Sequence, residues 1–266
     1  MLAMDIDTFY KDHWRDVEPE RFAVYEKIFK YSPAHEQLLA PAGFENGQVV
    51  VDYGCGPGAM AVELARRVGP EGHVHGVDIN AQFVVRARER AEQEGVGDRV
   101  TVHRIDSHGI PLEDAIADRV LCKNVLEYVD DPLATLQDIR RVLKPGGKVH
   151  ATDSDWGFLI AEPLSAEDTA ELMAAASHAF RTPAIGRKLY GLCRAAGFNE
   201  IAVRVVGIAD TSGARAGILN NMANYARDGG TLPEARLNQL MAAIEAGVED
   251  GTYLFVLPQF LVTGTA

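Results

Sequence analysis

The chain has 266 residues and a formal net charge of −12, from 26 lysine and arginine residues against 38 aspartate and glutamate residues. With 47% hydrophobic and 24% charged residues it has the composition of a globular protein, which excludes a mainly disordered chain. The negative charge disfavours binding to nucleic acid or to anionic membranes, so we expect a small or cationic ligand.

Strands alternate with helices along most of the sequence. Apolar runs predict five strands, at residues 49–51, 73–77, 100–105, 117–122 and 148–152, and two more near residues 201–208 and 253–262. Apolar residues at helical spacing predict the helices between the first five strands, at residues 59–68, 81–94 and 133–143. This alternation predicts the α/β class, with a Rossmann-like, doubly wound, mostly parallel seven-stranded sheet that has helices on both faces.

Two stretches lie outside this alternation. Residues 1–46 carry aromatic side chains at roughly helical spacing and are expected to form an N-terminal helical cap. Residues 47–266 are expected to form the ligand-binding domain, with a helical lid insertion at about residues 214–250, before the last strand. The aromatic side chains suit core packing, and both stretches are also placed to cover a ligand beyond the carboxyl ends of the strands.

The apolar runs, the cysteines and the histidines of the sequence predict the cellular location and whether a metal is bound. No apolar run reaches the roughly 18 residues of a membrane-spanning helix, and the N-terminal segment is acidic where a signal peptide is basic, so a cytoplasmic protein without membrane partners is expected. Cys55, Cys122 and Cys193 are too far apart to indicate a disulfide framework or a thiolate zinc site. His73 and His75 lie on one side of a predicted strand, where packing is favoured over metal binding, and no metal is expected.

A glycine turn follows the first predicted strand. Gly54, Gly56 and Gly58 fall within five residues, which lets the backbone approach a ligand without an intervening side chain. With Ala59 the turn also matches the G-x-G-x-x-A pattern of dinucleotide sites, although one such match is weak evidence.

Carboxylates follow the ends of three neighbouring strands. They are Asp52, Asp78 and Asp106. Each alone suits a helix cap or a solvated loop. A dinucleotide needs donors for its pyrophosphate, whereas a sulfonium ligand with an amino group and no phosphate suits several carboxylates. Three acids behind one glycine turn favour the sulfonium ligand.

In this order the segments resemble the motifs of class I S-adenosylmethionine-dependent methyltransferases. Residues 50–58 resemble the first motif and residues 73–80 the second, and the later motifs match residues 104–107, 118–128 and 143–147. The resemblance covers about residues 45–155. Beyond it, the chain is most similar to bacterial small-molecule enzymes of quinone and natural-product pathways.

The resemblance implies the cofactor S-adenosyl-L-methionine and a set of residues that bind it. Asp52 would hold its ammonium group, Asp78 its ribose hydroxyls, and Asp106 its adenine amino group. The full set implied by the resemblance is Asp52, Gly54, Gly56, Gly58, Asp78, Ile79, Asp106, Ser107, Lys123 and Asn124.

Candidates for catalysis lie after the fourth and fifth strands. Methyl transfer depends mainly on alignment, and a base is needed only where the methyl acceptor must lose a proton. Glu127, Tyr128 and Asp153 are the candidates, and structural roles at a helix start or in a loop are their alternatives. Many relatives carry a histidine where this chain has Tyr128, so the resemblance supports no histidine-based proton transfer there.

Other side chains are weaker candidates for contact with the methyl acceptor. His13, His178 and Tyr225 belong to the added helices. Trp156 and Phe158 offer aromatic surface that suits a planar or isoprenoid acceptor, or packing under the lid.

The sequence therefore favours an enzyme that transfers a methyl group from S-adenosylmethionine to the oxygen, nitrogen or carbon atom of a small organic acceptor, in natural-product or secondary metabolism. The alternatives are an NAD-dependent oxidoreductase and a protein of this fold that binds the cofactor without methylating. The expected partner is a small molecule, not nucleic acid, and formation of a homodimer is left open.

Overall fold

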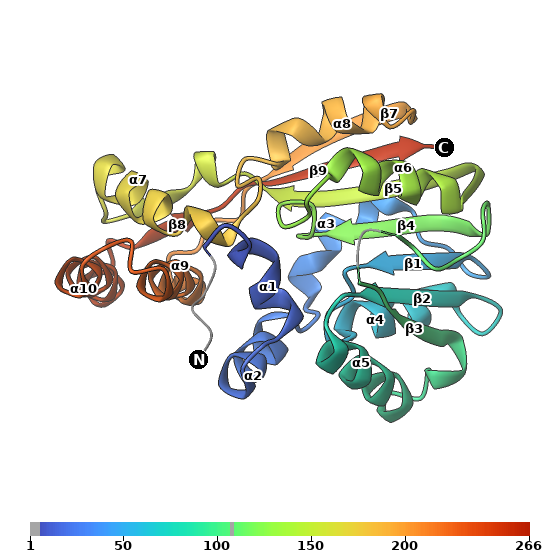
Figure 1. The fold of residues 1–266 in the computed structure, drawn as a ribbon, viewed down its shortest axis with the longest axis horizontal. Helices are drawn as coiled ribbons and strands as arrows, with labels where there is room; N and C mark the ends of the chain where they lie inside the picture. Colours follow the sequence, from blue (N-terminus) through green and yellow to red (C-terminus); the bar gives the residue numbers. More distant parts are fainter. Residues whose placement is uncertain (1–5, 107–108) are drawn as a thin grey trace.

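The computed structural model describes residues 6–106 and 109–266. The strands of its main sheet are β1 (Val49–Tyr53), β2 (His73–Asp78), β3 (Val100–Arg104), β4 (Ala117–Lys123), β5 (Leu143–Ser154), β7 (Asn199–Val206) and β9 (Gln259–Thr265). They lie in the order β3-β2-β1-β4-β5-β9-β7, and β9 is antiparallel to both of its neighbours (Figure 1). The Rossmann-like, mostly parallel seven-stranded sheet is confirmed.

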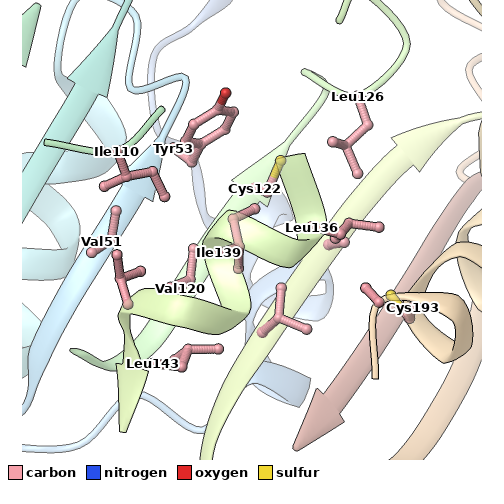
Figure 2. Close-up of a cluster of buried hydrophobic side chains, with 14 of the residues drawn as sticks. Val51, Tyr53, Ile110, Val120, Cys122, Leu126, Leu136, Ile139, Leu143 and Cys193 are labelled. Atoms are coloured by element: carbon pink, nitrogen blue, oxygen red, sulfur yellow. The ribbon is translucent and has the colours of Figure 1, made fainter. Parts of the chain in front are cut away.

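Helices cover both faces of this sheet. They are α4 (Ala59–Val68), α5 (Ala81–Gln93), α6 (Pro132–Val142) and α8 (Leu189–Ala195). Because side chains alternate along a strand, Val50 packs in the core beneath α4 and α5, whereas Val51 packs in the core beneath α6 and α8. Figure 2 shows the second core, where Ile139 of α6 lies near Val120 of β4. The two cores fix the direction in which the strands end.

A second group of elements lies beyond the strand ends. It contains α7 (Ala166–Ala175), α9 (Ala216–Asp228), α10 (Glu234–Asp250) and a small sheet of β6 (Ile160–Glu162) with β8 (Leu254–Val256). The two helices expected within residues 214–250 are present. The sequence predicts one last strand near residues 253–262, but the structure has two strands there. β8 pairs with β6, and only β9 joins the main sheet. Pro258 separates them and has no amide hydrogen to continue a ladder.

The N-terminal segment is helical, as expected. It contains α1 (Phe9–Arg15), α2 (Pro19–Ile28) and α3 (Glu36–Leu39), and Figure 1 shows α1 and α2 between the second group and the main sheet. Short 3-10 helices are η1 (Pro33–His35), η2 (Ala40–Ala42), η3 (Gly97–Arg99), η4 (Trp156–Phe158), η5 (Ser177–Ala179) and η6 (Gly186–Lys188). None of the described helices is both long and apolar enough to cross a membrane.

The N-terminal helices contact the C-terminal ones. The hydroxyl groups of Tyr25 on α2 and Tyr225 on α9 lie 3.3 Å apart. The guanidinium group of Arg21 lies 2.7 Å from the carboxylate of Asp228. Segments from the two ends of the chain thus meet beyond the strand ends, where an open α/β sheet binds its ligand.

Candidate functional site

A cavity of about 780 Å³ lies at the carboxyl ends of β1, β2 and β4. One part of its wall is the glycine turn, and other parts come from the N-terminal helices, from the start of α9, and from the ends of β7 and β9 that lie on the same edge of the sheet. This is the crevice in which the fold binds ligands.

The glycine turn needs glycine for two reasons. Gly54 and Gly58 have φ angles of 77° and 83°, in the left-handed region that side chains disfavour. A Cβ atom on Gly54 would lie 2.2 Å from Val125, and one on Gly58 would lie 2.7 Å from the backbone of Ala87. At Gly56 the space is open except for the ring of Phe29, 3.8 Å away. The turn therefore presents bare backbone to the cavity.

Asp52, at the end of β1, is buried in the wall of the cavity. Its Oδ2 atom has no hydrogen-bond partner among the described residues. Burial, and the nearby carboxylate of Asp78, raise the pKa of Asp52 to about 7. A cation beside Asp52 would stabilise its charged form and satisfy the unpaired oxygen.

Asp78, at the end of β2, holds the turn in place. Its two carboxylate oxygens accept the amide hydrogens of Gly56 and Asn80, each at 2.8 Å. Burial raises its pKa to about 6, and the amide hydrogen bonds partly offset this rise. Each oxygen still has a lone pair for a ligand hydroxyl.

The structure brings most of the other expected cofactor residues to the cavity. Ile79, Lys123 and Asn124 line it. Asn124 has a φ angle of 54°, and its amide donates to the carbonyl of Thr152 at 2.7 Å. Burial lowers the pKa of Lys123, while the carboxylates of Asp153 and Asp52 oppose that shift.

The third strand-end acid lies elsewhere. The side chain of Asp106 is 92% exposed and lies 3.5 Å from Arg104 rather than in the cavity. Its expected neighbour, Ser107, lies outside the described residues. The structure therefore does not place Asp106 where an adenine amino group would bind.

Of the three catalytic candidates, the structure brings Tyr128 to the cavity wall. Glu127 is buried behind it and accepts a hydrogen bond of 2.7 Å from the indole of Trp156. Asp153 is buried too, and its Oδ2 accepts the amide hydrogens of Val125 and Leu126. Burial raises the pKa of both Glu127 and Asp153. The two acids hold the loop after β4 in place.

The weaker candidates pack away from the cavity. His13, His178 and Tyr225 all lie within 6 Å of the ring of Phe9. Burial lowers the pKa of His13 to about 4, so its imidazole is neutral near pH 7. His73 and His75 lie against neighbouring side chains of the sheet, and no cluster of three or more metal-binding side chains occurs in the described part of the chain.

The expected aromatic surface is also elsewhere. Trp156 is buried, Phe158 is 51% exposed, and neither lines the cavity. The rings in the cavity wall are instead Trp14, Phe29 and Tyr128, with Phe83 and Tyr53. Sequence reasoning also missed His35, Arg215 and Gln259, which line the cavity from loops and from a strand start that carry no motif.

Comparison with known proteins agrees with this geometry. The family described as methyltransferase domain matches residues 44–197, more than half of the chain. A 2-phytyl-1,4-naphtoquinone methyltransferase of Trichormus variabilis is 34% identical over 118 residues, which are 44% of this chain and 52% of that protein. A dimethylglycine N-methyltransferase of Parasynechococcus marenigrum is 30% identical over 170 residues, 62% of this chain and 57% of that protein. The chain thus spans about half the length of these curated relatives.

Solved structures share the fold. A phosphoethanolamine N-methyltransferase 2 of Haemonchus contortus, in complex with S-adenosyl-L-methionine, has a TM-score of 0.64 at 19% identity, covering 99% of this chain and 60% of that one. A SAM-dependent methyltransferase of Aquifex aeolicus has a TM-score of 0.54 at 18% identity, covering 92% and 99%. The family match, together with the glycine turn and its buried carboxylates, leads to one conclusion: the chain belongs to the methyltransferase-domain family.

Proposed function

We propose that the protein transfers a methyl group from S-adenosyl-L-methionine to a small organic acceptor. The observation that carries the proposal is the buried, unpaired Oδ2 atom of Asp52 beside the bare glycine turn. Burial and the carboxylate of Asp78 make Asp52 costly to ionise, so this end of the cavity favours a cation over an anion.

The residues present fit the cofactor. Its α-ammonium group suits Asp52, and its ribose hydroxyls suit the free lone pairs of Asp78. Ile79 offers an apolar contact for adenine. Lys123 and Asn124 lie on the methionine side, on β4 and just after it. Support for Asp106 and Ser107 comes from the motif alone.

When bound, the cofactor supplies an electrophilic methyl group on a sulfonium and leaves as a neutral thioether. The chain has to align the acceptor's nucleophile with that methyl group and exclude water. Burial and the neighbouring Glu127 raise the pKa of Tyr128 well above its ordinary value, so its phenol stays protonated. The phenol hydrogen-bonds to the carboxylate of Glu127, so Tyr128 meets the methyl acceptor with its ring and its hydroxyl oxygen. In this proposal Tyr128 orients the acceptor by those contacts.

Proton removal is needed only for an acceptor that reacts through O–H or N–H. We keep Glu127 and Asp153 as candidate proton acceptors. Burial raises the pKa of Asp153 to about 7, in the range that suits a general base, and raises the pKa of Glu127 well above its ordinary value. Both lie behind the wall of the cavity, so this role needs a water or a small movement to reach the acceptor.

The proposal includes the division of the chain into an N-terminal cap, residues 1–46, and a cofactor domain with a lid at about residues 214–250. Contacts between α2 and α9 support a common role for these segments. The net charge of −12 supports a small-molecule acceptor over nucleic acid. The relatives and structures named above are methyltransferases, so they lend no support to an oxidoreductase.

Two measurements test the proposal. Calorimetry with S-adenosylmethionine, S-adenosylhomocysteine and NADH should show binding of the first two and none of NADH, and Asp52→Asn should weaken the first two. A screen of small acceptors with methyl-labelled cofactor, followed by mass spectrometry, should yield a labelled product. Binding of NADH without S-adenosylhomocysteine would reverse the assignment, and tight cofactor binding without any product would favour a non-methylating protein.

A further inference from the structure

The far part of the cavity carries the opposite charge from the glycine turn. His35, Lys123 and Arg215 line the same cavity, and they come from η1, from β4 and from the residue before α9. They are close enough that the charges of Lys123 and Arg215 both lower the pKa of His35, after the larger effect of burial. Two cations, Lys123 and Arg215, thus lie near a neutral histidine in the wall of this cavity, in a protein of net charge −12.

This positive charge is not balanced evenly. Lys123 faces the carboxylates of Asp52 and Asp153. The guanidinium group of Arg215 has no carboxylate within 4 Å among the described side chains, and its one hydrogen bond is a 3.4 Å contact with the carbonyl of Ile208. The nearby Asp210 uses its Oδ2 to accept the backbone amide of Arg215 instead. Arg215 therefore retains its full capacity to bind an anion.

His35 adds a donor. The Nδ1 atom of His35 lies 3.0 Å from the amide and the hydroxyl of Ser32 and 3.2 Å from its carbonyl oxygen. The subsite uses the tautomer in which Nδ1 accepts from the amide and Nε2 carries the hydrogen. That Nε2 has no hydrogen bond to another described residue, and His35 lines the cavity. Arg215 and His35 together provide donors for an anionic oxygen without a proton transfer.

The walls beside these donors are apolar with one polar exception. Ile208, Ile218 and Leu257 line this part of the cavity. Gln259 lines it too, and its amide nitrogen donates to the hydroxyl of Ser154 at 2.6 Å. The Oε1 atom of Gln259 is buried without a partner among the described residues. A buried acceptor left unpaired is costly, so a ligand with an O–H or N–H group would stabilise it.

The carboxylate of the cofactor itself is the other possible source of an anion. Asp52 lies on β1 and Gln259 on β9, three strand spacings apart, which is roughly 14 Å along the sheet. Lys123, on β4 beside β1, is the cation nearest to the cofactor end, whereas Arg215 contacts the segment that follows β7. Gln259 thus lies apart from Asp52, and Arg215 enters the same cavity from the segment after β7. Whether Arg215 holds the carboxylate of the acceptor or that of the cofactor is decided by the titrations below.

We propose that the far end of the cavity binds the methyl acceptor as an organic acid, with its carboxylate held by Arg215 and His35 and an O–H or N–H group donated to Gln259. The inference rests on the proposed methyl transfer and names the class of its substrate: small hydroxy or amino carboxylic acids with an apolar body.

Direct binding tests this subsite without turnover. The protein saturated with S-adenosylhomocysteine is titrated with matched acids and amides: benzoate and benzamide, 4-hydroxybenzoate and 4-hydroxybenzamide, and indole-3-acetate and indole-3-acetamide. We expect the acid to bind about tenfold or more tightly than its amide in at least one pair. Arg215→Gln should remove that preference, leave the amide unchanged, and leave the affinity for S-adenosylhomocysteine within about twofold of the original, a small fraction of the effect on the acid.

Matched variants control for charge and folding. Arg204→Gln removes the same charge from an exposed position on β7 outside the cavity, and it should change nothing. Arg215→Lys should retain part of the preference. His35→Gln should give a smaller loss than Arg215→Gln, because it removes one neutral donor. Melting curves confirm that each variant is folded.

Three outcomes overturn the proposal. The first is that no acid binds more tightly than its amide in any pair, and the second is that Arg204→Gln has the same effect as Arg215→Gln. The third is that Arg215→Gln weakens the binding of S-adenosylhomocysteine as much as that of the acid, which would assign the cations to the carboxylate of the cofactor. Failure of S-adenosylhomocysteine to bind the unmodified protein would instead refute the proposed function. The same titrations without it then decide the subsite alone.

Discussion

The two ends of the cavity are built in different ways. At the acidic end, Asp52 and Asp78 lie on neighbouring strands, and the glycine turn between them is held by backbone hydrogen bonds. At the basic end, His35 comes from η1 and Arg215 from the residue before α9, segments that lie far apart in the chain. The acidic end is thus built from neighbouring strands and backbone hydrogen bonds, whereas the basic end depends on how distant segments pack. If the proposed function and subsite hold, the cofactor and the methyl acceptor are recognised by these two differently built parts.

The largest expected effect, on both stability and cofactor binding, comes from a substitution in the glycine turn at the acidic end. Gly54→Ala combines a left-handed φ angle with a Cβ atom 2.2 Å from Val125. Left-handed strain and overpacking together should lower the free energy of unfolding by about 2–5 kcal/mol and abolish cofactor binding. Urea denaturation and calorimetry measure the two effects.

Gly95→Ala is the matched control. Gly95 also has a positive φ angle, 70°, but no atom lies within 4 Å of its added Cβ. It should cost only about 1–2 kcal/mol and leave cofactor binding intact. Equal costs for both variants, with cofactor binding retained, would show that close backbone approach at Gly54 is not needed.

The next two predictions distinguish the roles of the two carboxylates at the acidic end. Asp52→Asn should weaken S-adenosylmethionine binding about 10- to 150-fold, through loss of a charge-assisted hydrogen bond. At pH 8 the free variant should be more stable than the original, because a buried carboxylate with a pKa of about 7 is charged there at a cost. Calorimetry and urea denaturation provide the readouts.

Asp78→Ala should weaken binding to a similar extent with the opposite effect on stability. Its carboxylate accepts the amide hydrogens of Gly56 and Asn80. At pH 4, close to the ordinary pKa of 3.8 and well below the folded value of about 6, burial of Asp78 costs little relative to the unfolded chain, so removing it should lower the free energy of unfolding by about 1–3 kcal/mol. Stability that responds identically to the two substitutions would contradict the distinct roles assigned to these acids.

Much of the acidic end could be predicted from the sequence because its signals are local. The helix expected at residues 59–68 has the same bounds in the structure, since apolar periodicity and the preceding glycine fix it. The strand ends place Asp52 and Asp78 together through parallel pairing in register. Asp106 differs, because its side chain is exposed and lies outside the cavity; a motif fixes the chain position and not the rotamer, so its role at the adenine stays a prediction.

The basic end could not be predicted, for a physical reason. The encounter of His35 with Arg215 depends on how the helices pack beyond the sheet, and no spacing in the sequence encodes it. The division of the last strand at Pro258 has the same origin, because β8 finds its partner in β6, which the sequence analysis did not predict.

A smaller effect is expected in the pH dependence of cofactor binding. Asp52 has an ordinary pKa near 3.8 that burial raises to about 7, so at pH 6 most of it is protonated and cannot pair with a cation. Affinity for S-adenosylmethionine should therefore rise about fivefold to tenfold between pH 6 and 7.5, as the carboxylate forms. Calorimetry across this range measures the rise. In Asp52→Asn the rise should shrink to about twofold, which is the part that Asp78 contributes with its pKa of about 6, and an unchanged slope would assign the titration to another group.

The smallest expected effect concerns the cover of the two ends. The Tyr25 to Tyr225 and Arg21 to Asp228 contacts join α2 to α9, which belong to the proposed cap and the proposed lid. Trp14 and Phe29 line the cavity from the N-terminal side, and Ile218 lines it from α9. If the two ends bind separate ligands, each ligand should order its own cover.

We therefore predict a two-step change in hydrogen exchange. S-adenosylhomocysteine alone should slow exchange in α1 and α2, where Trp14 and Phe29 face the cofactor end. Exchange in α9 should slow further only when a carboxylic acid probe such as 4-hydroxybenzoate is added, since Arg215 lies directly before this helix. The added protection should be modest, because the free energy of opening a segment that covers a ligand site lies at the low end of the opening free energies within a protein. If exchange is the same in all states, the helices that cover the two ends are permanently packed. If S-adenosylhomocysteine alone protects both α2 and α9, the contacts between these helices make them open and close as one unit.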